Sequence, residues 1–177
     1  MMRHHKIKAP FPKPHSPVAR LFHWGFLGLF VYGISKGLDN VTQLADSAFW
    51  AFEMSFASVF LAVLGLRYWF MRRTRPTVLD ENTPKWLRQL ARLGHLALYT
   101  SLALIALSGL IIGGLFRFGI AEGVLMDTAI GFHEVSINAS YLLIAGHVLA
   151  AIGHRILGDG VWSTMVPILK EKPRTKA

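Results

Sequence analysis

The chain alternates between long apolar stretches and short polar or basic ones. Four stretches are predominantly apolar, and they cover about residues 18–35, 48–71, 93–115 and 132–154. A helix that crosses the roughly 30 Å hydrocarbon core of a bilayer needs about 20 such residues. Because a segment in lipid must satisfy its own backbone hydrogen bonds, these stretches indicate helices. The pattern predicts an all-α fold, an integral membrane four-helix bundle.

Composition supports a membrane protein and limits its cofactors. Hydrophobic residues make up 53% of the chain and the mean hydropathy is +0.40, whereas soluble domains contain about 45–50% apolar residues. The absence of cysteine excludes disulfides, cysteine-ligated iron–sulfur clusters and covalent c-type haem. A haem in this chain would therefore be held by coordination and packing alone.

The distribution of positive charge predicts the topology. The 19 Lys and Arg residues give a formal net charge of +9, and only Lys36 and Arg117 lie in the segments that alternate spans place outside. The positive-inside rule then predicts that both termini are cytoplasmic. Topology explains the basic charge, so we do not expect nucleic acid as a partner.

We expect three parts along the chain: a basic, proline-rich cytoplasmic tail, a transmembrane haem-binding domain and a second cytoplasmic tail, at residues 1–17, 18–157 and 158–177. The first tail lacks the apolar region and cleavage site of a signal peptide. Its histidines, His15 among them, are expected to be solvated.

The fourth apolar stretch carries histidines at regular intervals. His133, His147 and His154 are fourteen and seven residues apart, which brings their rings to nearly the same face of a helix. His133 and His147 would stand roughly 21 Å apart, near opposite edges of the hydrocarbon core. Each ring could simply hydrogen-bond a neighbouring helix. Three on one face favour a cofactor, and neutral imidazole is a haem-iron ligand.

Polar residues in the other spans lie at matching depths. The first span rises from the inside and the fourth returns to it, so His23 and His147 are expected together near the inner face. His133 is expected near the outer face, level with Glu53 and Met54 of the second span. A carboxylate such as Glu53 at this depth needs a partner or a function.

Four sequence stretches resemble the prokaryotic cytochrome b561 family of four-helix membrane haem proteins, which is similar to the cytochrome b subunits of membrane hydrogenases. They are RLFHW, LARLGHLALY, FHEVSINASYLLIAGH and AAIGHRI, at residues 20–24, 90–99, 132–147 and 150–156. The specificity of the resemblance lies in the spacing of His133 and His147 combined with the early His23.

The resemblance implies a ligand set for haem b. His23 and His147 would be the axial ligands of an inner haem, and His133 would bind an outer haem together with a histidine early in the second span. Glu53 stands at that last position, and the span has no histidine. Three alternatives follow: Met54 or Glu53 ligates the outer iron, His133 ligates it alone, or the outer haem is absent.

Three further residues are candidates for cofactor contacts at the inner face. Arg67 lies within the second span and is the best candidate to bind a haem propionate, because a guanidinium pairs well with a carboxylate. His95 and His154 lie near the inner surface, where haem propionates or a ubiquinone headgroup would need hydrogen-bonding partners.

The function that follows is electron transfer by a b-type cytochrome of the bacterial inner membrane, between the quinone pool and a periplasmic redox protein or dehydrogenase subunit. Family members also include a stand-alone oxidase of superoxide that reduces quinone. Such an oxidase needs a cationic outer surface, whereas acidic residues outnumber Lys36 and Arg117 in the outer loops. The rival from another class is a haem-free structural or assembly subunit whose histidines pair helices.

Overall fold

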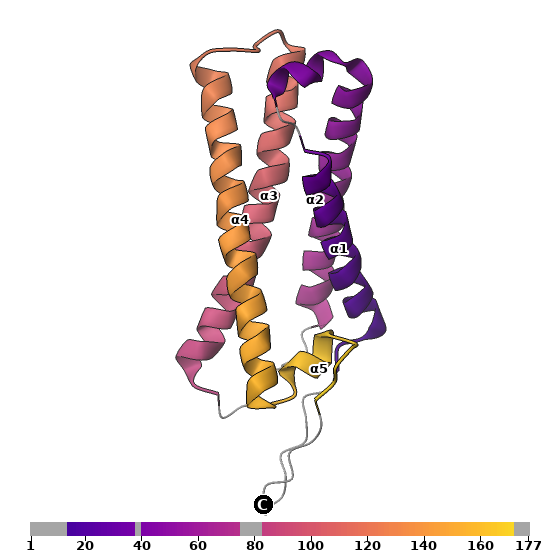
Figure 1. Ribbon diagram of the computed structural model, residues 1–177, viewed down its shortest axis with the longest axis vertical. Helices are drawn as coiled ribbons and strands as arrows, with labels where there is room; N and C mark the ends of the chain where they lie inside the picture. The colour runs from indigo at the N-terminus through magenta and orange to yellow at the C-terminus, as the bar shows by residue number, and fades with distance from the viewer. Residues whose placement is uncertain (1–13, 38–39, 75–82, 172–177) are drawn as a thin grey trace, which may run out of the picture.

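The computed structural model describes residues 14–37, 40–74 and 83–171. Four long helices run alternately up and down beside one another, and two short helices close the ends (Figure 1). The helices are α1, the 3₁₀ helix η1, α2, α3, α4 and α5, at Pro17–Ser35, Val41–Ala45, Ser47–Thr74, Lys85–Arg117, Val124–Leu157 and Val161–Met165. The long helices α1 to α4 are each apolar and long enough to cross a membrane. The predicted all-α membrane bundle is confirmed.

Local sequence explains where the helices begin and end. The hydroxyl of Ser16 accepts a hydrogen bond from the Ala19 backbone N–H, and Pro17 occupies the first turn of α1, where no partner for its nitrogen is needed. At the other end of the chain, α4 stops at Gly158, whose φ of 64° is left-handed and suits glycine. Both ends of the domain are therefore set by capping residues.

Two of the long helices extend beyond the apolar stretches that predicted them. The helix α3 begins at Lys85 and α4 begins at Val124, about two turns before residues 93 and 132. The first turns of α4 are held by a small core at the end of the bundle that carries η1, in which Met126 packs with Leu44 and Ile112. We label this end outer and the end that carries α5 inner, following the sides expected from the sequence. The bundle is thus longer than the hydrocarbon core, and its outer end is closed by η1.

The bundle interior has a mainly aromatic half and a small-residue half. The helices α1 and α2 meet through phenylalanines, with the ring centres of Phe26 and Phe60 4.8 Å apart. The most extensive contact joins α3 to α4. Here the buried polar residues are serines, which let helix backbones approach closely; they are Ser101, Ser108, Ser136 and Ser140.

The inner end of the bundle is covered by α5 and the residues after it. The Thr164 carbonyl accepts a hydrogen bond from the His15 backbone N–H at 3.2 Å, and the Met165 carbonyl accepts one from the Trp24 indole, also at 3.2 Å. The Glu171 carboxylate accepts from Ser163. The segment from 158 to 171, expected to be a tail, thus packs against the start of α1.

His15 differs from its sequence-based expectation. It was expected to be solvated, but the residue is only 8% exposed, and its backbone N–H bonds to the Thr164 carbonyl of α5. Burial lowers the pKa of His15, and the nearby positive groups Arg20 and His95 lower it further. The neutral form is therefore favoured at this position, which lies just before the first membrane span.

Candidate functional site

The inner half of the bundle brings together one polar side chain from each long helix. They are His23 of α1, Arg67 of α2, His95 of α3 and His147 of α4. The His147 ring centre lies 6.4 Å from that of His23 and 5.1 Å from that of His95. The predicted proximity of His23 and His147 is confirmed.

The spacing of His23 and His147 suits two ligands of one metal. A metal–imidazole bond is about 2 Å long, so two rings on opposite sides of one metal stand roughly 6 Å apart between centres. The observed 6.4 Å agrees with this separation. His95 lies closer to His147 than His23 does, and its ring meets that of His147 edge-on, at 79° between ring planes. This is a contact between two rings and not the geometry of two ligands on one metal.

Arg67 is held in the interior by His23 and two aromatic rings. Its guanidinium donates a hydrogen bond to His23 Nδ1 at 2.8 Å, and its guanidinium carbon lies 5.5 Å from the ring centres of Phe26 and Tyr99. Within the described ranges its buried Nε–H has no hydrogen-bond acceptor. A buried cation with a free donor favours an anionic ligand such as a carboxylate.

The hydrogen bond from Arg67 determines the tautomer of His23. Arginine only donates, so Nδ1 must be an acceptor and the proton of the neutral ring is on Nε2. Ligation of a metal through Nε2 requires the other tautomer. Metal binding at His23 therefore requires Arg67 to leave Nδ1 for another acceptor.

The outer site is built around His133. Its Nδ1 lies 2.8 Å from the Ser108 hydroxyl of α3, and a side chain on the next residue, Gly109, would lie 3.5 Å from His133 Cε1. One turn further along the same face of α3, Met54 packs directly on Gly113 and leaves no room there for a side chain. Met54 of α2 and His133 of α4 thus both pack against α3.

Glu53 lies on a different face of α2 from Met54. Glu53, Phe60 and Arg67 follow one another at intervals of seven residues, so they share the face that carries the buried Phe60. Across the part of the chain that the structure describes, Glu53 makes no hydrogen bond or ion pair, and the polar partner of His133 is Ser108. Glu53 is therefore level with the outer site but not paired with its histidine.

The family comparison decides the class of the protein. The family model described as prokaryotic cytochrome b561 matches residues 14–167, which include all four long helices and α5. The chain belongs to the prokaryotic cytochrome b561 family. It is therefore a multi-pass bacterial membrane cytochrome of electron transfer, and membership implies binding of b-type haem. Searches of the curated proteins and of the solved structures gave no match.

The residues of this cytochrome fit a haem better than a free metal ion. Among residues 14–37, 40–74 and 83–171, no cluster of three or more His, Cys, Asp or Glu side chains could hold a metal. Haem needs only axial ligands from the protein, since the macrocycle supplies the other four. The His23–His147 separation and the free Nε–H of Arg67 match an axial pair with a propionate partner.

The other candidates of the cytochrome lie at its inner end. The ring of His95 donates from Nδ1 to the Ala91 carbonyl at 2.7 Å, which leaves Nε2 as an acceptor. The His154 ring donates a hydrogen bond from Nδ1 to the Asp159 carboxylate at 2.6 Å, at the end of α4. The role of each in contacting haem or quinone stays a prediction.

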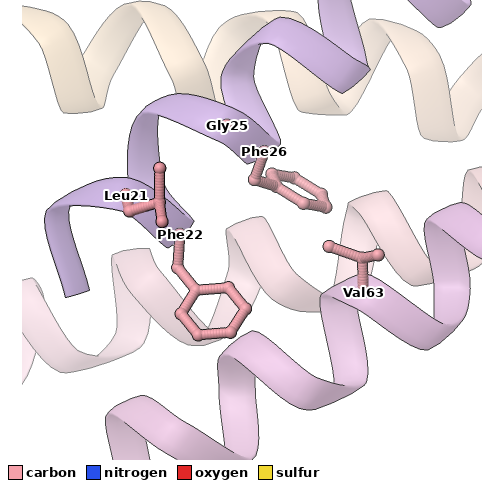
Figure 2. A pocket seen from close by; sticks show the side chains of 5 residues that line it. All are labelled: Leu21, Phe22, Gly25, Phe26 and Val63. Carbon is pink, nitrogen blue, oxygen red and sulfur yellow. The ribbon is translucent and has the colours of Figure 1, made fainter. Parts of the chain in front are cut away.

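One apolar hollow lies between two of the helices, and no histidine lines it. It has a volume of about 170 Å³ and lies between α1 and α2, where Phe22, Phe26 and Val63 line it together with Leu21 and Gly25 (Figure 2). With no polar side chain in its lining, it cannot orient a headgroup by hydrogen bonds. It is suited to a lipid tail.

Two site residues were missed by sequence reasoning. Ser108 and His15 gave no signal of their own, because serine is common in membrane helices and His15 precedes the first span. The signal that could have indicated Ser108 is its place directly before Gly109, where a neighbouring helix can approach closely.

Proposed function

We propose that this cytochrome transfers single electrons between the quinone pool and a donor or acceptor at the outer face of the bacterial inner membrane. The observation that carries the proposal is the 6.4 Å separation of the His23 and His147 rings in a chain of this family. Haem b supplies a one-electron couple at its iron. The partner at the outer face would be a periplasmic redox protein or a dehydrogenase subunit.

Each inner residue has a distinct role in this proposal. His23 of α1 and His147 of α4 would hold the haem iron. Arg67 would pair with a haem propionate in place of His23 Nδ1, which would give its charge a counter-ion and leave His23 Nδ1 free to carry a proton. The positive charge of Arg67 would favour the reduced iron, because that state carries one positive charge less than the oxidised one, and this effect weakens with distance.

His95 is the proposed contact for a ubiquinone headgroup at the inner face. Its ring is partly solvent-exposed, touches His147, and keeps Nε2 as a hydrogen-bond acceptor. A quinol hydroxyl is a suitable donor for that nitrogen. His154 is the second candidate, with Asp159 able to take part in proton exchange beside it.

An outer haem is proposed with His133 as its ligand. The opposite ligand is Met54, Glu53 or none, and the three alternatives lead to different haem contents. The placement of Met54 on Gly113 favours a packing role for its thioether.

A free-standing superoxide oxidase is the second candidate function. In the described outer segments Lys36 and Arg117 are accompanied by Asp46, Glu122 and Asp127. This balance does not attract an anionic substrate, so we favour an electron-transfer subunit or partner.

An absorption spectrum of the purified protein tests the cytochrome. Reduction with dithionite is expected to give split α and β bands of low-spin haem, and a pyridine haemochrome assay should give at least one haem b per chain. Addition of a short-chain ubiquinol under anaerobic conditions should reduce the same bands. A featureless visible region would instead support the haem-free structural subunit.

We also propose that both termini are cytoplasmic, on the inner excess of Lys and Arg. A reporter enzyme that is active only in the periplasm, fused after Ala177, is expected to be silent, while the same reporter inserted at Gly119, between α3 and α4, should be active. Activity in the reverse pattern would exchange the inner and outer labels of every site.

A further inference from the structure

Ser108 is a buried serine that contacts the outer histidine. It is 2% exposed, lies on α3, and its hydroxyl oxygen is 2.8 Å from Nδ1 of His133 on α4. The same hydroxyl lies 2.5 Å from the Leu104 carbonyl and 3.1 Å from the Ile105 carbonyl, both in the preceding turn of its own helix. Its three hydrogen-bond partners therefore all lie inside the bundle.

The direction of the hydrogen bond follows from the inventory of donors. A carbonyl oxygen can only accept, so the single hydroxyl proton of Ser108 is donated to its own helix, mainly to Leu104. The hydroxyl oxygen then accepts from His133, whose Nδ1 must carry a proton. Neutral His133 thus has its lone pair on Nε2.

This arrangement is the opposite of the one at the inner site. His23 Nδ1 accepts a hydrogen bond from Arg67, whereas His133 Nδ1 donates one to Ser108. A metal-ligating histidine usually donates from its non-ligating nitrogen to a fixed acceptor, which sets both tautomer and ring orientation. His133 has this arrangement already, and His23 acquires it only when Arg67 moves.

We propose that Ser108 is a positioning residue that holds His133 in the tautomer presenting Nε2 to the outer site. The inference rests on the proposed function only in that it takes the ligand of His133 to be haem iron. Gly109 supports the geometry, because the bare backbone beside Ser108 lets the His133 ring lie along α3. Loss of such an outer-sphere acceptor typically costs about 10- to 100-fold in metal affinity.

The test compares Ser108→Ala with Ser101→Ala in the full-length protein in nanodiscs. Ser101 is a matched control, because it is also buried on α3 and its hydroxyl bonds only the Leu98 carbonyl. Ser108→Thr should restore the wild-type behaviour by supplying a hydroxyl again. Two measurements are made on each sample. The first follows the loss of haem per chain after dilution into apomyoglobin, which scavenges haem. The second is the ¹⁵N spectrum of labelled histidines in the dithionite-reduced protein, in which the His133 signal is assigned by its absence from His133→Gln.

If the wild type holds an outer haem, Ser108→Ala is expected to release it at least about tenfold faster, while Ser101→Ala and Ser108→Thr retain it. If the wild type lacks that haem, His133 is expected to show a single Nδ1–H tautomer that becomes a mixture in Ser108→Ala alone. Equal behaviour of Ser108→Ala and wild type, or an equal change in Ser101→Ala, would overturn the inference. A wild type without any haem would refute the proposed function, and the ¹⁵N spectrum would still decide on Ser108.

Discussion

Replacement of His147 by alanine is expected to remove the inner haem from the cytochrome. The His147 ring of α4 lies 6.4 Å from that of His23 between ring centres, so its loss would leave the proposed iron site with His23 alone. His23→Ala should have the same effect from α1. The haem-to-protein ratio, measured by pyridine haemochrome, should fall by one in each variant, and the corresponding low-spin α band should disappear.

His95→Ala is the control for these two variants. Its ring is nearer to His147, at 5.1 Å, but meets it edge-on, and its Nδ1 is occupied by its own helix. The inner haem should therefore be retained in His95→Ala, with altered quinol reduction as the main change. A normal low-spin spectrum in both His147→Ala and His23→Ala would refute the axial pair.

Glu53→His is expected to change the occupancy of the outer site. Glu53 shares the buried face of α2 with Phe60 and Arg67, has no hydrogen-bond partner within the described residues, and is level with His133. By the resemblance to the family pattern, a histidine there would supply the second imidazole of the outer site. If the wild type holds one haem, the ratio should rise to two. If it holds two, the ratio should stay at two and the outer spectrum should become that of a bis-histidine haem.

Met54→Leu tests Met54 as the second ligand of the outer site against the other two alternatives, Glu53 and no second ligand. Because the Met54 thioether packs directly on Gly113, leucine should fill the same space and leave the spectrum unchanged. A change in the outer spectrum would identify Met54 as a ligand. A folded Glu53→His variant that still holds one haem would show that packing closes the site, for which the stacked rings of Phe52 and Phe56 are the candidates.

Periodicity was sufficient to predict the spans and the shared depth of His23 and His147. Both depend only on helical repeats and on alternating direction, which the sequence contains. The helices α3 and α4 begin about two turns before the apolar stretches that predicted them, because helical turns beyond the hydrocarbon core carry no continuous apolar signal. Hydropathy therefore measures the membrane-embedded part of a helix and not the whole helix.

The partners of the site residues could not be predicted in the same way. Whether His133 meets Glu53 or Ser108 depends on which faces of α2, α3 and α4 pack together, and their rotation is set by small residues such as Gly109 and Gly113. The burial of His15 depends on α5, which lies at the far end of the chain. Both are consequences of tertiary packing.

The inner site takes one residue from each long helix, and this has a consequence for how the protein is made. His23 leaves the ribosome more than a hundred residues before His147. At typical elongation rates this is a delay on the order of ten seconds. During that interval the buried charge of Arg67 has no completed bundle around it. If His23 and His147 hold the iron together, as we propose, inner haem is captured only once α4 is inserted. The hydrogen bond from Trp24 to Met165, 141 residues apart, can then form as the chain is completed. Truncated chains of this cytochrome should therefore emerge without inner haem, so that cofactor loading reports on complete synthesis.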